Sequence, residues 1–283
     1  MAVNKKNLVI RVLSGVILGP AVVFSFSIYP TLLGLVTSIV LLSAFEFIEF
    51  SNRDFKNVIL KLFITLTIGV STLVYGFALQ AENQGILPFD AETIFFIGFA
   101  VIMGSIILNV KDISIAKELA SSSAVSLLYI AFFLSFFYKF NLQYGPSMSI
   151  LCLTSVWMYD ASAYFFGMNF GKHKLSPVFS PKKSWEGFYG GILGTFVYII
   201  VFEFIRNYMG YNNTINIIYA VIFAVCVGIF DTIGDITESV FKRYYGVKDS
   251  GEILPGHGGM LDRIDGLLVV APIWYFLLRV FLI

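Results

Sequence analysis

Residues 214–243 read TINIIYAVIFAVCVGIFDTIGDITESVFKR, and no charged side chain occurs before Asp231. A hydrocarbon core about 30 Å thick needs about 20 mostly apolar helical residues. The stretch is therefore long and apolar enough to cross a membrane. Asp231, Asp235, Glu238 and Lys242 follow one another at steps of four, three and four residues. At about 3.6 residues per turn, all four lie on one helical face.

This acidic face is a candidate functional site, because an acid inside a membrane span is costly. Three stacked acids repel one another unless a cation lies among them. Carboxylate oxygens are the ligands that Mg²⁺ prefers. The alternative is ion pairing with Lys242, Arg243 or Arg263 in a solvated helix end, and this alternative is strongest for Glu238.

The composition of the whole chain also indicates a membrane protein. Charged residues make up 13% of the 283 residues and apolar residues 58%, whereas charged residues make up about 25% of an ordinary soluble domain. These values exclude a disordered chain, a disulfide scaffold and a nucleic-acid-binding module that relies on general basicity. We therefore expect lipid as a partner and no nucleic acid.

The remaining sequence predicts an all-α, polytopic membrane protein with about nine transmembrane helices. We treat residues 1–283 as a single membrane domain, with scaffold helices in 1–145 and the chemistry in 146–283. The predicted spans are 8–28, 31–50, 58–80, 93–110, 118–138, 148–168, 187–205, 214–234 and 264–283.

The placement of lysine and arginine predicts the orientation of these spans. With a cytoplasmic amino terminus, only three of the 19 basic residues fall on the opposite side, namely Lys139, Arg206 and Arg279. The carboxy terminus then lies on that opposite side. The polar connections 171–186 and 242–263 both face the cytoplasm, where nucleotides are.

The connection after the acidic face combines glycines, acids and bases. Gly256, Gly258 and Gly259 let the backbone approach a ligand closely. The residues that follow open the last span, so free amides there would face an anion. Lys248, Arg243 and Arg263 supply positive charge for phosphates, and His257 is a candidate for phosphate contact or loop positioning.

Two further acids in this connection predict a metal site between helices. Asp262 and Asp265 are three residues apart and share a helical face, so with Asp235 they would complete a metal cage. A tight turn without a ligand is the plain alternative.

A second constellation lies upstream, at Ser180-Pro181-Lys182-Lys183-Ser184. Two lysines beside hydroxyls and a helix start form an anion site, although a capping role for Ser184 explains part of the pattern. The lysines are alternatively anchors for acidic lipid headgroups. Asp160 is an acid in the span 148–168, so we expect it to face the bundle interior. Glu46 and Glu49 are weaker candidates, for which pairing with a lysine or arginine is an equal alternative.

The motifs resemble the signature of the phosphatidate cytidylyltransferase family. The resemblance is carried by Ser239-Val240-Phe241-Lys242-Arg243, by Lys248-Asp249, and by His257-Gly258-Gly259 continuing through Asp265. Residues 180–187 and 231–235 are also similar to family patterns, so the likeness covers about residues 155–270.

The resemblance implies that CTP and phosphatidate react to give CDP-diacylglycerol and pyrophosphate, with Mg²⁺, a second cation beside it, and a homodimer in the cell membrane. It implies an active site facing the cytoplasm. Asp235 and Asp262 are the leading metal ligands, followed by Asp231 and Asp265. Catalytic phosphate handling falls to Ser239, Lys242 and Arg263. Substrate binding falls to Lys182, Lys183, Ser180, Ser184, Lys248, His257, Gly258, Gly259 and Asp160.

One alternative from another functional class is a cation-coupled membrane transporter that uses the intramembrane acids. A transporter predicts acids spread across the membrane depth. Here the acids gather at one end of a span together with glycine turns and bases, which favours phosphate chemistry.

Overall fold

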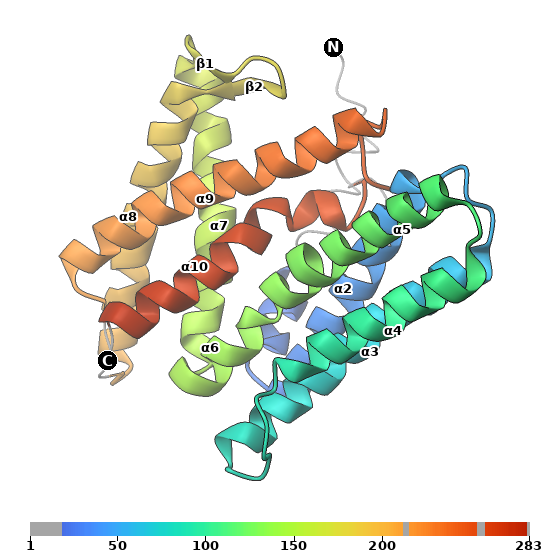
Figure 1. Cartoon of the computed structure of the whole chain (residues 1–283). Helices are drawn as coiled ribbons and strands as arrows, with labels where there is room; N and C mark the ends of the chain where they lie inside the picture. The colour runs from blue at the N-terminus through green and yellow to red at the C-terminus, as the bar shows by residue number, and fades with distance from the viewer. Residues whose placement is uncertain (1–18, 212–214, 254–257, 282–283) are drawn as a thin grey trace. The chain divides into compact units, whose positions relative to one another are not determined.

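The computed structural model describes residues 19–211, 215–253 and 258–281, and it is built almost entirely of helices (Figure 1). The longer helices are α2 (Tyr29–Ser51), α3 (Val58–Asn83), α4 (Thr93–Asn109), α5 (Ile113–Val125), α6 (Phe136–Tyr144), α7 (Pro146–Phe170), α8 (Trp185–Tyr208), α9 (Ile217–Tyr244) and α10 (Asp265–Phe281). A π-helical stretch, η1 (Ser126–Phe132), lies between α5 and α6, and a single 3-10 turn, η2 (Leu261–Arg263), precedes α10.

The predicted all-α membrane class is confirmed. Within the described residues, five helical segments are long and apolar enough to cross a membrane: Tyr29–Ser51, Val58–Asn83, Ile113–Tyr144, Trp185–Tyr208 and Ile217–Tyr244. Helix α4 is apolar but shorter. The predicted spans 148–168 and 264–283 correspond to helices α7 and α10, which are not among those five. Most of the predicted span 8–28 lies outside the described residues, so nine spans stay a prediction.

The basic connection between α7 and α8 contains an element that helical periodicity did not predict. Strand β1 (Lys174–Ser176) pairs antiparallel with strand β2 (Ser180–Ser184). Ser184 then begins α8, because its Oγ accepts a hydrogen bond from the amide of Gly187 at 3.2 Å. The predicted capping role of Ser184 is therefore confirmed. The cap also fixes the end of β2, the strand that carries Lys182 and Lys183, against the start of α8.

The chain forms two compact units, and the first comprises residues 1–146 together with 245–264. Helix α2 packs against α3, α5 and η1 around buried aromatic and aliphatic side chains such as Tyr75, Phe137 and Tyr138. A buried amide strengthens the α2–α5 contact, since Asn52 Nδ2 donates to Ser122 Oγ at 2.8 Å.

The second unit comprises residues 147–244 and 265–283, and its core is the packing of α9 against α10 and α8. Two glycines let α9 and α10 touch. A Cβ added to Gly234 would overlap the backbone of Asp265, and one added to Gly266 would overlap the carboxylate of Asp231. This close crossing determines where the acids of the two helices meet.

Candidate functional site

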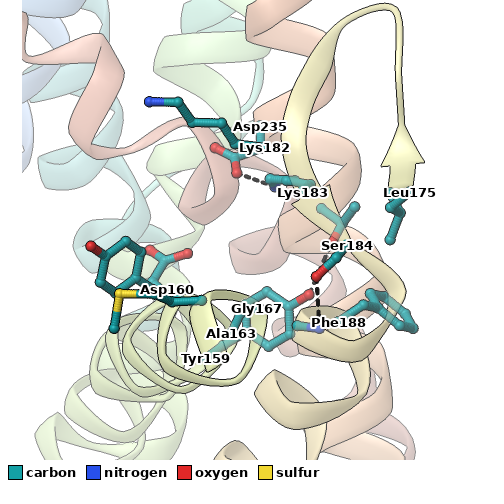
Figure 2. Close-up of a pocket in the computed structure, with 14 residues that line it drawn as sticks. Tyr159, Asp160, Ala163, Gly167, Leu175, Lys182, Lys183, Ser184, Phe188 and Asp235 are labelled. Atoms are coloured by element: carbon teal, nitrogen blue, oxygen red, sulfur yellow. Dashed lines mark hydrogen bonds and ion pairs between the residues drawn. The ribbon is translucent and has the colours of Figure 1, made fainter. Parts of the chain in front are cut away.

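A cavity of about 530 Å³ opens in the second unit, between helices α7, α8 and α9 and the β1–β2 hairpin (Figure 2). Its charged lining residues are Asp160, Lys182, Lys183 and Asp235. Aromatic and small residues of α7 and α8 supply most of the remaining wall, together with Met168, Leu175, Ser184 and Thr232. Helices α7, α8 and α9, which correspond to the predicted spans 148–168, 187–205 and 214–234, line the cavity. No described residue of α10 does.

Lys183 and Asp235 form the central ion pair of this cavity. Figure 2 shows the Lys183 ammonium reaching from β2 to the Asp235 carboxylate of α9. Both side chains are only about one-quarter exposed, at 25% and 28%. The structure therefore brings one residue of the predicted basic motif onto the predicted acidic face, where a phosphate and a cation would meet.

Two further carboxyl groups, those of Asp231 and Asp265, lie close to Asp235. Asp235 and Asp265 are joined by a side-chain hydrogen bond, and Asp231 lies within electrostatic range of Asp235, Asp160 and Lys183. Asp231 is 1% exposed, and its Oδ2 has no hydrogen-bond partner within the described residues. Two ionised carboxylates this close repel each other, so the group requires a shared proton or a cation in addition to Lys183.

The donor set fits a hard divalent cation in its chemistry. Asp231, Asp235 and Asp265 offer only carboxylate oxygens, and one of these oxygens is buried and unsatisfied. Within the described residues no group of three or more histidines, cysteines or acids has a ready metal-binding arrangement. The ion pair explains this in part, because Lys183 holds the Asp235 oxygen that a cation would take.

The outer end of the acidic face is different. Glu238 is buried and pairs with Lys242 at 2.5 Å, one helical turn later. For Glu238 the ion-pair alternative is therefore the one that the structure supports. Ser239 lies beside this pair at intermediate exposure, and Arg243 is exposed.

The glycine-rich connection belongs to the first unit, and it differs from the prediction in one respect. The amides of Gly259, Met260 and Leu261 all donate to carboxylates of this chain, at 2.9 to 3.0 Å. The expectation that free amides before the last span would face an anion is therefore wrong for these three. These three amides close the turn, and phosphate binding by the side chains of this connection stays a prediction.

Asp262 takes part in that closure. Its Oδ2 accepts hydrogen bonds from Ser250 N, Ser250 Oγ and Gly259 N, each at 3.0 Å. Its role as a metal ligand beside Asp235 stays a prediction, since Asp262 belongs to the first unit and Asp235 to the second. Lys248 and Arg263 are exposed at either side of the turn. Gly258 adopts a φ of 86°, a conformation that favours glycine. His257 lies outside the described residues.

The remaining predicted residues lie around the cavity. Asp160 lines it but is exposed, and Lys182 is exposed next to Lys183. Ser180 begins β2 at intermediate exposure, and buried Ser184 ends it. Tyr159, which sequence reasoning named nowhere, donates or accepts a 2.9 Å hydrogen bond with Thr232 in the cavity wall. An aromatic residue within an apolar span gives no sequence signal for such a contact.

The sequence did not distinguish Glu46 from Glu49, although the structure gives them different partners. Of the two candidate glutamates on α2, Glu49 pairs with Lys61 at 2.9 Å, as the lysine alternative predicts. Glu46 instead accepts the amides of Met260 and Leu261, more than 200 positions along the chain. Only a long-range contact distinguishes the two.

The comparisons with known proteins agree on one family. Residues 9–281 match the model of the cytidylyltransferase family. The chain is 39% identical over 272 residues to a phosphatidate cytidylyltransferase of Thermotoga maritima, covering 95% of this chain and 96% of that one. Proteins of the same name from Bacillus subtilis and Staphylococcus epidermidis are 43% identical over 139 residues and 40% identical over 159 residues. These alignments cover 49% and 56% of this chain, and 50% and 59% of the respective relatives.

Proposed function

Because this chain belongs to the cytidylyltransferase family, we propose that it is a phosphatidate cytidylyltransferase. It transfers CMP from CTP to phosphatidate and forms CDP-diacylglycerol and pyrophosphate. The main support for the proposal is the 39% identity, over 95% of this chain, to a relative of that name. The Lys183–Asp235 pair, in a cavity with four charged side chains among apolar helices, agrees with it. No comparison favours the transporter alternative.

The reaction needs charge neutralisation more than a strong base. An oxygen of the lipid phosphate attacks the α-phosphorus of CTP, and the bond from that phosphorus to the bridging oxygen breaks. Pyrophosphate leaves with the electron pair. The second pKa of a phosphate monoester is about 6, so the attacking group is already mostly a dianion at neutral pH. The barrier therefore lies in bringing two polyanions together.

The basic side chains meet this need. Lys183 lines the cavity and Lys182 stands beside it on β2, where both can hold phosphate oxygens. Lys242, Lys248 and Arg263 bind the remaining phosphate charge, and Ser239 and Ser180 donate hydroxyls. Ser184 caps α8 and also lines the cavity, so it orients the strand and binds substrate there. Asp160 contacts the nucleotide from the part of the cavity wall that α7 forms.

The acids would hold the metal. Asp235, Asp231 and Asp265 are its ligands in the second unit, with Asp262 as the candidate from the first. A bound Mg²⁺, with or without a second cation, neutralises the phosphates and stabilises the leaving pyrophosphate. Asp235 would hold the cation through the carboxylate that pairs with Lys183 in this structure, and Lys183 would hold an oxygen of the phosphate.

The setting of the enzyme completes the proposal. It lies in the cell membrane with nine spans, a cytoplasmic amino terminus, and the cavity facing the cytoplasm. Apolar side chains exposed on the helices, such as Phe96, Leu108 and Phe204, suit contact with lipid chains. We expect a homodimer, as the family resemblance implies.

The test is a cytidylyl-transfer assay on purified full-length protein, with radiolabelled CTP, phosphatidate vesicles and a Mg²⁺ titration. Asp235→Asn should lower transfer about 100-fold or more and raise the Mg²⁺ requirement, because even groups behind a metal ligand are worth 10- to 100-fold. The control is Asp90→Asn, which changes an exposed acid 145 positions before Asp235 in the sequence and should leave transfer unchanged. Transfer that resists chelation, or full activity of Asp235→Asn at an unchanged Mg²⁺ requirement, would refute the metal assignment. A wild-type chain that makes no CDP-diacylglycerol would refute the function.

A further inference from the structure

The residues that join α9 to α10 are tied to helix α2 by one buried carboxylate. We call residues 250–253 and 258–262 the joining segment. Glu46 on α2 is 4% exposed. Its Oε1 accepts the amide of Met260 at 2.9 Å, and its Oε2 accepts the amide of Leu261 at 2.9 Å and the hydroxyl of Ser250 at 3.1 Å.

A second carboxylate, that of Asp262 in the joining segment itself, also holds the segment closed. Asp262 accepts the amides of Ser250 and Gly259, and the Ser250 hydroxyl lies within reach of both acids, at 3.1 Å from Glu46 and 3.0 Å from Asp262. The two ends of the segment are therefore closed on each other, and Glu46 attaches the closed turn to a membrane helix.

The fit around Glu46 leaves no room for a side chain. A Cβ added to Gly251 would lie 2.6 Å from Glu46 Oε1, and one added to Gly259 would lie 2.8 Å from Glu46 Oε2. Real Cβ atoms essentially never come this close to another heavy atom. The approach of this carboxylate explains Gly251, and at Gly259 the Ser250 hydroxyl and the amide of Gly251 lie closer still to the added Cβ.

Backbone amides and a hydroxyl stabilise the Glu46 charge. Within the described residues no lysine, arginine or histidine forms an ion pair with Glu46, whereas Glu49 on the same helix pairs with Lys61 and is 52% exposed. A buried carboxylate without such donors would be very costly. Hydrogen bonds to an ionised acceptor are also about twice as strong as neutral ones. If the joining segment opened, the Glu46 carboxylate would lose these hydrogen-bond donors. The closed conformation of the segment is therefore strongly preferred.

We propose that Glu46 is a positioning residue for the transfer reaction. It holds the joining segment closed, so that Lys248 before it and Arg263 after it are presented to phosphates in one fixed arrangement. The inference rests on the proposed function for what those two bases bind. The attachment of the segment to α2 can be measured without any substrate.

The first experiment measures local opening. Glu252 is exposed in the joining segment, so a glutamate-specific protease should cut there only when the segment opens. Glu46→Gln replaces one acceptor oxygen by an N–H donor that faces another donor. We expect cleavage after Glu252 to rise about 10- to 100-fold, the equivalent of losing one or two hydrogen bonds to a charged group. Asp54→Asn, the same kind of change at an exposed acid of the same unit, should cut at the wild-type rate.

The second experiment separates positioning from loss of folded protein. In the transfer assay, Glu46→Gln should lower kcat/KM for CTP about 10- to 100-fold with a raised KM, since a misplacement of about 1 Å can cost 100-fold. A smaller folded fraction alone lowers kcat and leaves KM unchanged. Ser250→Ala removes the shared hydroxyl without touching a charge. Ser250→Ala should raise cleavage after Glu252 about 3- to 10-fold. If the Glu46→Gln protein does not accumulate in cells, the Ser250→Ala result alone tests the proposal.

The proposal is overturned by wild-type cleavage in Glu46→Gln, by equal cleavage in Glu46→Gln and Asp54→Asn, or by faster cleavage with an unchanged KM for CTP. For Ser250→Ala the same criteria hold. An inactive wild-type chain would contradict the transferase proposal instead, and the protease result would still decide whether Glu46 holds the segment.

Discussion

At the scale of single residues, the chemistry of the site follows from the sequence but the pairings do not. The spacing of Asp231 and Asp235 correctly predicted a shared face, because helical periodicity is local. The contact between Lys183 and Asp235 joins a strand to a helix about 50 positions later, and no local rule predicts it. The same applies to Glu46, whose donors follow more than 200 positions later.

Lys183 offers a direct test at this scale. Lys183→Gln removes the cation that pairs with Asp235, so we expect transfer to fall about 100-fold as phosphate stabilisation is lost. The apparent Mg²⁺ requirement should not rise, because the carboxylates lose a competitor. In Asp235→Asn the Mg²⁺ requirement should rise, so a titration of both variants separates the two roles.

The matched control is Lys182→Gln, which changes the exposed neighbour on the same strand. It should affect transfer less than Lys183→Gln does. Equal losses in both variants, or a Lys183→Gln enzyme that needs more Mg²⁺, would show that the ion pair has no special role.

At the scale of elements, the site depends on how closely two helices cross. Gly234 of α9 and Gly266 of α10 face the partner helix with no room for a Cβ, and the acids of both helices meet beside them. The sequence shows both glycines next to acids. It does not show that their use is helix contact, because a glycine before or within an apolar run has several common explanations.

Gly266→Ala should push α10 away from Asp231. Overpacking of this kind typically costs about 1–3 kcal/mol of stability, and separation of the acids should remove most transfer activity. Thermal unfolding in detergent and the transfer assay measure the two effects. Gly34→Ala on α2, where a Cβ meets nothing within 4 Å, should leave both unchanged. A fully active, equally stable Gly266→Ala protein would contradict the role of the crossing.

At the scale of the whole molecule, hydropathy predicted most helices within a few residues. The predicted spans 31–50, 58–80 and 187–205 became Tyr29–Ser51, Val58–Asn83 and Trp185–Tyr208. Two features were not predictable in this way. The β1–β2 hairpin is too short for an alternating pattern to show, and the π-helical stretch Ser126–Phe132 shares its apolar composition with ordinary helix.

The nine-span orientation can be tested by labelling single cysteines. Cys152 and Cys226 are first replaced by alanine, and one cysteine is introduced at Lys174 in the hairpin or at Tyr208, which is 90% exposed at the end of α8. A membrane-impermeant maleimide should label Lys174→Cys only in inside-out vesicles and Tyr208→Cys only in right-side-out ones. Labelling of both positions from one side would contradict the proposed orientation.

The attachment of Glu46 to Leu261 also has a consequence for biosynthesis. These partners are 215 positions apart. At a synthesis rate of about 5–20 residues per second, the ribosome needs about 10–40 s to deliver the donors after Glu46 has emerged. Throughout that interval the acid has no permanent partner. The amino-terminal helices are therefore made before the partners of Glu46 exist. The first unit is complete only when the segment around Leu261 has been synthesised and packs against α2.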